Sequence, residues 1–419
     1  MGNFFERIGD FIILAGKHAA SFIVSVVRHK SFKVVAPIVA VAVVAIIVLV
    51  VSMPQAQTPD PNISAPVSSD PPLTSESPSS TPSTSPTPPP PLPSEPSLEP
   101  SVSPSDEPVP AGPVNPLTGL VIEEESSGNR PVAIMINNYR QAQPLLGVSK
   151  ADILYEIVVE GGITRMLAIF HDVSVVGVIG SIRSSRLYFV DVAQSYDAIY
   201  LHAGGSTEAY EALINRGITR FDGVNGPGSS IFYRDPARLQ TMSYESTMVT
   251  TGARILDYFG SHELRLTLSD GYKRELSFTE DGTPKSGAQA MSFEVLFSSG
   301  SKATSFTYNT VDTLYYPAQY GGDIKDGVDG SLLAVTNVLI LQTSVSTIPG
   351  DAEGRQRVAT KGTGTGYYVN GGKYVEITWS RSSDTSQFEY KLLDGSELVM
   401  GQGRTYICII SDTLNMEFS

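Results

Sequence analysis

Cysteine is nearly absent from this chain of 419 residues, in which Cys408 is the only one. A single cysteine cannot form an internal disulfide, and it cannot build a multi-cysteine metal site. Cys408 also lies far from the N-terminus, so it cannot be the lipidated cysteine of a bacterial lipobox. We interpret it as a small buried hydrophobic residue.

Basic residues are scarce as well. The chain contains 29 Lys and Arg against 43 Asp and Glu, and its formal net charge is −14. Residues 1–33 carry +3 and residues 54–113 carry −7, so the remainder carries −10. Because a region this acidic repels the phosphate backbone, the sequence predicts no nucleic-acid partner.

Proline is unevenly distributed, since 20 of the 29 prolines lie in residues 54–113. That segment is also rich in Ser and Thr, and it cannot bury enough apolar surface to fold. Its composition favours extended polyproline II. We therefore predict a disordered, proline-rich stalk over residues 54–114, with the foldable chain starting near Asn115.

Charge is absent from residues 34–53, an apolar run long enough to span about 30 Å as a helix. Basic residues precede this run, and the positive-inside rule then places residues 1–33 in the cytoplasm and the rest of the chain outside. A cleaved signal peptide is the alternative, but its apolar region is typically only about 7–15 residues long. The sequence predicts a single-pass anchor in the cell membrane over 34–53.

Residues 4–26 repeat apolar side chains at helical spacing, with polar ones between them. This pattern predicts an amphipathic segment within residues 1–33. Two interpretations remain open: the segment lies in the membrane interface, or it extends the anchor helix.

The predicted secondary-structure pattern of the foldable chain changes near residue 262. Before it, β-prone runs alternate with helical periodicity, which predicts a layered α/β (or α+β) first domain over 115–262. After it, short β-prone runs predict a mostly β second domain over 263–419. In the first domain we expect strands at 131–137, 152–160, 166–170 and 197–202, and helices at 186–194, 206–216 and 248–259, the last capped by Thr247.

In the second domain, Asn370-Gly371 is a strong hairpin signal, and Asp394-Gly395 marks another turn. Residues 405–410 are predicted to form a terminal strand that contains Cys408. The other expected strands are 263–268, 275–279, 292–297, 304–308, 338–343, 367–369 and 374–379.

Three dense runs stand out in the first domain: 160–165 (EGGITR), 180–186 (GSIRSSR) and 197–206 (DAIYLHAGGS). Together with 129–131 and 151–156, they resemble the YerB-like family, whose Gram-positive members are named as lipoproteins. That family is a domain of unknown function in N- and C-terminal parts. The resemblance implies an envelope protein and implies no particular reaction.

The resemblance covers most of residues 115–419, and in the second domain the runs 354–355, 362–364 and 376–379 support it more weakly. Two features depart from the family. Its members attach through a lipidated cysteine, whereas this chain is predicted to use a helix. The family also has an Ala-Pro-His-Asn stretch after its Arg-Asp motif, and here no histidine follows Arg234-Asp235.

An anion-binding site is predicted around Arg183 and Arg186, which flank Ser184 and Ser185 just before a helix. Guanidinium forks, hydroxyls and a helix N-terminus together favour phosphate or carboxylate. The alternative is structural: Ser185 caps the helix and the arginines pair with carboxylates of the same domain. The carboxylates considered are Glu156, Glu160 and Asp191, and the candidate ligand-binding set also includes Arg165 and Glu160.

The HAGGS run adds His202, Gly204, Gly205 and Ser206 to the candidate set, because glycines let backbone amides approach a bound group. A satisfied histidine beside a tight turn is the alternative. His171, Asp172 and Glu208 could join His202 as ligands, but we predict no metal site and no cofactor.

Whether the protein is an enzyme is left open by these residues. One hypothesis is a binding or regulatory module of the Gram-positive envelope, with a cell-wall polymer or an envelope protein as partner. The alternative is an envelope hydrolase or transferase that uses Glu156, Glu160 or His202, with the two glutamates on one face as paired carboxylates. Ser206 lacks the Gly-x-Ser-x-Gly elbow. A purely structural subunit is a third possibility.

Tyrosines cluster in the second domain. Exposed tyrosines stack on sugars, whereas tyrosines on strands are commonly half-buried cross-strand partners, and both interpretations are kept. The cluster comprises Tyr308, Tyr315, Tyr316 and Tyr320.

Overall fold

The computed structural model describes residues 112–226, 228–273, 275–298 and 302–419. The predicted cytoplasmic segment, the anchor and nearly all of the stalk lie outside these ranges. Within the described ranges, no helix is both long enough and apolar enough to cross a membrane.

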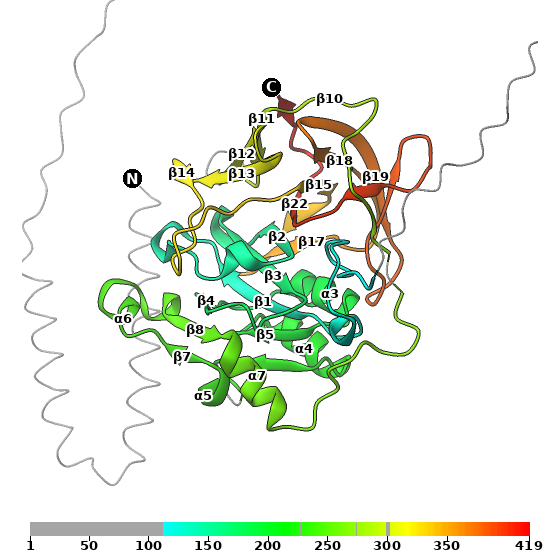
Figure 1. Ribbon diagram of the computed structural model, residues 1–419. Helices are drawn as coiled ribbons and strands as arrows, with labels where there is room; N and C mark the ends of the chain where they lie inside the picture. Colours follow the sequence, from blue (N-terminus) through cyan, green and yellow to red (C-terminus); the bar gives the residue numbers. More distant parts are fainter. Residues whose placement is uncertain (1–111, 227, 274, 299–301) are drawn as a thin grey trace, which may run out of the picture. The chain divides into compact units, whose positions relative to one another are not determined.

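A central mixed sheet of eleven strands organises the described region (Figure 1). Strands β1, β5 and β6 are parallel to one another, and so are β2, β22 and β15, while β3 runs antiparallel between β1 and β2. Across the sheet the order is β10 (Ala288–Gln289), β19 (Lys373–Arg381), β18 (Gly362–Asn370), β15 (Asn337–Thr343), β22 (Thr405–Ser411), β2 (Ile153–Val158), β3 (Thr164–Phe170), β1 (Val132–Asn137), β5 (Ile199–His202) and β6 (Arg220–Asp222), with β20 (Glu389–Leu392) beside β19.

The middle strands of this sheet are buried on both faces. Every residue of β1, β2 and β3 is buried, as near-continuous apolar strands covered on both sides require. On one face lies α3 (Leu187–Ser195), where Tyr155 of β2 shares a hydrogen bond of 2.9 Å with Tyr196. Helix α4 (Thr207–Asn215) packs against α3.

The other face of the central sheet is covered by a five-stranded antiparallel sheet, in which β11 to β14 are drawn in yellow tones and β23 in red in Figure 1. Its strands alternate buried and more exposed positions, the period of a sheet with one solvated face. The two sheets meet at Phe306 and Tyr406, whose ring centroids are 5.1 Å apart. The order is β14 (Gly322–Asp323), β13 (Leu314–Gln319), β12 (Ala303–Asn309), β11 (Ser292–Leu296) and β23 (Glu417–Phe418).

Smaller elements complete the described region. A three-stranded sheet has the order β4 (Val178–Gly180), β8 (Met248–Thr251) and β7 (Tyr233–Arg234). Two-stranded sheets pair β16 (Val345–Thr347) with β17 (Gln356–Val358), and β9 (Ser277–Thr279) with β21 (Val399–Gly401). The remaining helices are α5 (Gly228–Ile231), α6 (Arg238–Thr241), α7 (Gly252–Gly260) and the 3-10 turns η1 (Glu124–Ser126), η2 (Arg140–Ala142), η3 (Val148–Lys150), η4 (Glu160–Gly162) and η5 (Tyr244–Ser246).

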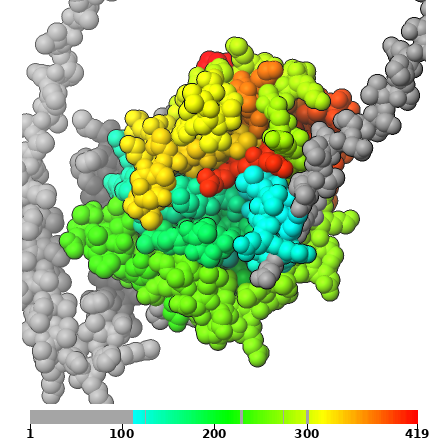
Figure 2. Space-filling model, in the orientation of Figure 1, coloured from blue at the N-terminus to red at the C-terminus, as the bar shows by residue number. Residues whose placement is uncertain are grey.

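Segments far apart in the sequence lie side by side. Strand β2 pairs with β22 in parallel, with Glu156 opposite Cys408, so both predicted domains contribute to one sheet. Gly403 donates its amide to the carbonyl of Thr118 at 2.8 Å, and Figure 2 shows the start of the described region next to the C-terminal segment. The described fold is therefore mixed, mostly β, in several sheets. The division at residue 262 stays a prediction.

Two expected elements are wrong. Residues 248–251 form strand β8, and α7 starts only at Gly252, where the Thr251 hydroxyl accepts the Arg254 amide at 3.1 Å. The Met-Val-Thr-Thr run is largely buried and rich in β-branched residues, which suits a strand better than a first helical turn. Residues 263–268 form no strand beyond a single bridge between Asn129 and Thr267.

Both turns predicted in the second half are present, although the first lies one residue later than the Asn370-Gly371 signal, with Gly371-Gly372 as its loop. Asn370 pairs with Lys373 across a two-residue loop, and Gly371 and Gly372 have φ of 59° and 75°, as this class of tight hairpin requires. Gly395 has φ of 88° in the second turn. Cys408 is fully buried in β22, as a small hydrophobic residue would be.

Candidate functional site

The candidate site lies at one edge of the central sheet. The carboxyl ends of β1, β5 and β6 meet there because these strands are parallel. The amino end of antiparallel β3 reaches the same edge, with Arg165 opposite Asn137. Such an edge is where open sheets of this kind commonly bind ligands.

The structure brings all ten predicted ligand-binding residues to this edge. Backbone contacts tie the runs 180–186 and 197–206 together: the Ser185 amide donates to the Gly204 carbonyl at 2.9 Å, and the Ser206 amide donates to the Ser185 carbonyl at 3.2 Å. The third run joins them through a side chain, since Arg165 Nη1 donates to the Ser184 carbonyl at 2.7 Å. The residues are Glu160 in η4, Arg165 at the start of β3, Arg183, Ser184 and Ser185 in the loop before α3, Arg186 at the α3 N-cap, His202 at the end of β5, Gly204 and Gly205 in the next loop, and Ser206 at the α4 N-cap.

One carboxylate joins two arginines at the centre of the site. Glu160 Oε1 accepts from Arg165 Nη2 at 2.7 Å and from Arg186 Nη2, and Oε2 accepts from Arg186 Nε at 3.1 Å. The side chains of Arg165 and Arg186 are buried, whereas that of Glu160 is 21% exposed. The cluster is therefore reached from solvent mainly through the Glu160 carboxylate.

Burial and charge act against each other in this cluster. Burial lowers the pKa of Arg165 to about 10, because a low-dielectric site disfavours its charge. Burial raises the pKa of Glu160, but attraction to Arg165 and Arg186 outweighs it and holds that pKa below its ordinary value. The ion pair is intact at neutral pH.

The local sequence explains how Glu160 reaches the arginines. Strand β2 ends at Val158, and the Val159 amide donates to the Ile163 carbonyl across the turn. Gly161 and Gly162 both have φ of 70°, a left-handed conformation that other residues rarely adopt. The two glycines that follow Glu160 therefore form the turn that places its carboxylate beside the arginines.

Arg183 is the least committed arginine of the set. Its Nη1 donates to the Glu245 carbonyl at 3.4 Å, and its buried Nε finds no acceptor among the described residues. Beside it, the Arg234 guanidinium stacks over the exposed Tyr244 ring at 3.9 Å. Arg183 therefore keeps hydrogen-bonding capacity that a bound anion could use.

His202 stabilises the loops of the candidate site through a hydrogen bond and ring stacking. Its ring is fully buried, and Nδ1 donates to the Gly204 carbonyl at 2.8 Å. The ring stacks on Tyr200, which shares a hydrogen bond of 2.7 Å with Ser185. Burial lowers the pKa of His202, although Asp222 opposes the effect. His202 therefore lies beside a tight turn, as the structural alternative expected, but only Nδ1 is satisfied, because the buried Nε2 has no partner among the described residues.

The glycine loop after His202 also stabilises the candidate site. Gly204 has φ of 79° and donates its amide to Asp222 Oδ1 at 2.8 Å. A Cβ on Gly204 would also approach Ser184 Oγ to 3.3 Å. Ser206 accepts the Ala209 amide at 3.3 Å and so caps α4.

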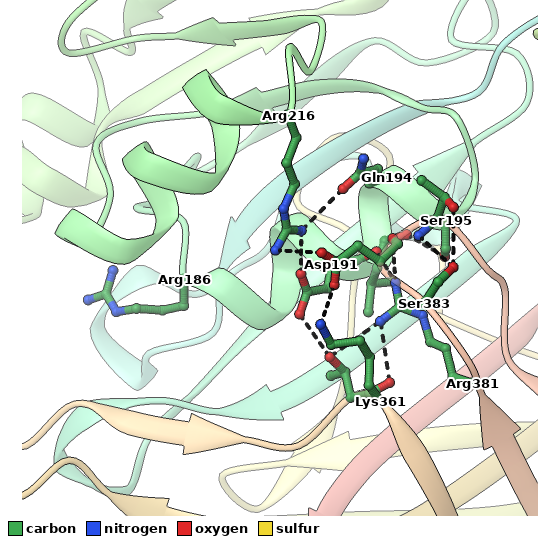
Figure 3. A network of polar contacts seen from close by, with 12 residues as sticks. Arg186, Asp191, Gln194, Ser195, Arg216, Lys361, Arg381 and Ser383 are labelled. Carbon is green, nitrogen blue, oxygen red and sulfur yellow. Dashed lines mark hydrogen bonds and ion pairs between the residues drawn. The ribbon is translucent and has the colours of Figure 1, made fainter.

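The expected structural alternative is realised only in part. Arg186 pairs with Glu160, but Ser185 does not cap α3, because Arg186 occupies the N-cap and provides no side-chain cap. Asp191 accepts instead from Arg216 at 2.6 Å. Figure 3 shows Arg186 pointing away from this network, which gathers around the middle of α3.

The network in Figure 3 joins α3 to the second half of the chain. Asp191 accepts from Thr360 at 3.0 Å, and Arg381 donates to the Asp191 carbonyl at 2.7 Å. Arg381 is almost fully buried, and Lys361 pairs with Asp384 at 2.6 Å. These contacts hold α3, and hence Arg186 at its start, in place.

The expected pairing of Glu156 with Glu160 on one face is wrong. The strand stops before Glu160, so strand periodicity does not relate the two residues. Glu156 is fully buried and accepts from Thr164 at 2.6 Å and Thr304 at 2.7 Å, facing the five-stranded sheet. The hydrogen-bond partners of the two carboxylates are different residues.

The sequence did not reveal the buried cluster around Glu156. Lys302 Nζ lies 3.4 Å from Glu156 and 4.3 Å from the Tyr320 ring centroid, and only 2% of the Lys302 side chain is exposed. Burial lowers the pKa of Lys302, and Glu156 opposes that shift. The Tyr406 hydroxyl also donates to Glu156 at 2.6 Å. A lysine next to a strand is normally exposed to solvent, so nothing in the local sequence predicted that Lys302 would be buried.

The remaining expectations concern metals and tyrosines. Among the described residues, no group of three or more His, Cys, Asp or Glu side chains could hold a metal ion. Tyr308 and Tyr315 face each other across β12 and β13 with ring centroids 5.0 Å apart. The Tyr316 hydroxyl donates to Asp312 at 2.5 Å. Tyr308, Tyr315 and Tyr316 therefore make these contacts within the five-stranded sheet and its turn.

Comparison with known proteins covers most of the described region. The family description "Protein of unknown function (DUF3048) N-terminal domain" matches residues 117–263, and its C-terminal domain matches residues 293–407. "Putative lipoprotein YerB" of Bacillus subtilis (strain 168) is 28% identical over 303 residues, 71% of this chain and 86% of that protein. The crystal structure of the YerB protein from Bacillus subtilis matches with 27% identity and a TM-score of 0.64, covering 73% of this chain and 99% of that one.

Proposed function

The chain belongs to the DUF3048 family, whose function is unknown, and from that premise we propose that it is an envelope binding or regulatory module that recognises an anionic ligand. The observation that carries the proposal is the cluster of Arg165, Arg183 and Arg186 around the single carboxylate of Glu160. The charge of Glu245 also acts on Arg183, so three guanidinium groups face two carboxylates, which leaves a local positive surplus in a strongly acidic protein. An anion would find there the forked donors that carboxylate and phosphate favour.

The order of exposure supports binding at this cluster. Arg165 and Arg186 are buried and already satisfied by Glu160, so they form the floor. Arg183 is only half-buried and has one long hydrogen bond of 3.4 Å. We infer that Arg183 makes the direct contact with the ligand and that Glu160, Arg165 and Arg186 position it.

The proposed place of action is the cell envelope. The relative from Bacillus subtilis is named as a lipoprotein, and the apolar run at residues 34–53 would provide an anchor of a different kind. With residues 54–114 as a stalk, the site would work outside the membrane, within reach of a cell-wall polymer or another envelope protein.

Retention of the full-length chain, solubilised in detergent, on purified wall material tests this proposal. We expect Arg183→Ala to weaken retention about tenfold, the factor that losing one charge-assisted hydrogen bond produces. Arg404→Ala is the matched control, because Arg404 is exposed and lies in a different groove. Equal retention of the two variants would contradict the proposal.

The geometry favours binding over the alternative of an envelope hydrolase or transferase. Glu156 and His202 are fully buried, and Glu160 is held by two arginines. Incubation with wall fragments followed by mass spectrometry decides between the two hypotheses. New products that the Glu160→Gln variant no longer forms would show that the protein is an enzyme and would contradict the binding-module proposal.

A further inference from the structure

A small cavity next to the arginine cluster is the strongest additional site in the described region. It has a volume of about 60 Å³ and lies between the start of α3, the start of α4 and strand β17. Holding one water takes about 10–15 Å³ of such space, so the cavity admits a small polyatomic group. Among its lining residues are Arg186, Tyr188, Ser206, Glu208, Arg355 and Arg357.

We propose that this cavity binds the phosphate group of the ligand, with Arg355 and Arg357 as recognition residues. The proposal rests on the proposed function, since Arg186 contributes to both sites. It adds a second wall to the site and a chemical class for the ligand. Arg186 comes from the N-terminal matched range, whereas Arg355 and Arg357 come from the C-terminal one.

The three arginines are held in different ways. Arg186 is fixed by Glu160. Arg355 is fixed by Asp351 at 2.7 Å and Glu353 at 2.8 Å, and its buried Nε has no acceptor among the described residues. The hydrogen bond to Asp351 is the main cause that raises the pKa of Arg355, and Glu160 lies close enough to add a smaller contribution. One donor of a fixed guanidinium is therefore still available.

Arg357 is the free member of the group. Its side chain is exposed and makes no hydrogen bond or ion pair with the described part of the chain. It follows Arg355 on β17, where the register opposes it to Ser346 of β16. A phosphate in the cavity would give this guanidinium the partner it lacks.

Acidic residues already pair with two of the three arginines, so the uncompensated positive charge of the cavity comes from Arg357. Asp191 is occupied by Arg216 and Thr360. Glu208 is exposed and is the only other acid among the described residues that line the cavity. The first turn of α3 contains no acidic residue, and its N-cap provides no side-chain hydrogen bond, which adds to the positive potential without defining the site.

The number of converging forks argues for phosphate over carboxylate. A carboxylate has two oxygens and is saturated by one or two guanidinium groups. A phosphate offers three or more oxygens in a tetrahedral arrangement, which suits three arginines from two segments, Arg186 at the start of α3 and Arg355 and Arg357 at β17. A phosphodiester polymer and a free phosphate compound share this chemistry, and experiment separates them.

Calorimetric titration of the detergent-solubilised full-length chain tests the proposal with three probes: inorganic phosphate, acetate at equal ionic strength, and a glycerol phosphate oligomer. We expect phosphate to bind and acetate to bind at least tenfold more weakly. Arg357→Ala should weaken phosphate binding about tenfold, while Arg404→Ala should leave it unchanged. Arg355→Lys, which keeps the charge and loses the fork, should also weaken it.

Each outcome has a defined meaning. Tighter binding of the oligomer supports a polymer ligand, and equal binding of inorganic phosphate supports a free phosphate compound. Equal affinities of Arg357→Ala and Arg404→Ala, or equal affinities for acetate and phosphate, would overturn the proposal. If wall retention still depends on Arg183 in that case, the proposed function survives without this cavity. If Arg183→Ala leaves wall retention unchanged, the proposed function fails on its own test.

Discussion

At the scale of single residues, two carboxylates of one motif region have opposite situations. Glu160 is partly exposed and pairs with arginines at the sheet edge, whereas Glu156 is enclosed between the two sheets. The sequence indicated both as acidic partners of nearby arginines. It could not show that a strand end separates them, or that a distant lysine would be the charge beside Glu156.

The buried pair of Glu156 and Lys302 yields a stability prediction. Glu156→Gln leaves the Lys302 ammonium buried without its counter-charge, and we expect a loss of about 3 kcal/mol in unfolding free energy. The double variant Glu156→Gln/Lys302→Met removes both charges and should regain part of that loss. Urea unfolding of the full-length chain measures both, and a double variant no more stable than Glu156→Gln would contradict this account.

His202 yields a prediction about pH. Burial holds its folded-state pKa below the ordinary value of 6.5, so the unfolded chain binds more protons near and below that pH. The neutral imidazole therefore contributes stability above about pH 6.5, and the contribution is lost as the pH falls through the folded pKa. Urea unfolding at a series of pH values should show a shallower decline in stability for His202→Gln than for the wild type. Parallel curves would rule out this role.

At the scale of elements, periodicity predicted most strands and helices of residues 115–262, because their apolar faces recur over several turns or strand positions. The prediction failed at residues 248–251, where a β-branched run begins a segment that continues as helix. The pairing of this run with β4 and β7 decided its conformation, and such pairing has no local signal. The hairpin with the loop Gly371-Gly372 was predictable to within one residue because its turn chemistry is local.

The corrected start of α7 makes a specific prediction. Thr251, and not Thr247, accepts the amide that begins the helix. Thr251→Ala should lower the unfolding free energy by about 1 kcal/mol, whereas Thr251→Ser retains a capping hydroxyl and should cost only a few tenths. Thermal or urea unfolding of the two variants checks the difference, and equal stabilities would show that the cap contributes nothing.

At the scale of the whole molecule, the central fact is that the two matched ranges share one sheet. Parallel pairing of β2 with β22 joins residues that are far apart in the sequence, and neither the composition nor any motif predicts this pairing. The same long-range assembly places Arg355 and Arg357 beside Arg186. The motifs therefore predicted one wall of the candidate site, and the other wall required the three-dimensional structure.

The most direct measurement of the central claim compares wild type, Arg183→Ala and Arg404→Ala for retention on purified wall material, all as full-length chains. Arg183 keeps unused hydrogen-bonding capacity at the site, and Arg404 lies in another groove. The account predicts that Arg404→Ala matches the wild type and that Arg183→Ala is retained about tenfold more weakly. Identical retention of all three would contradict it.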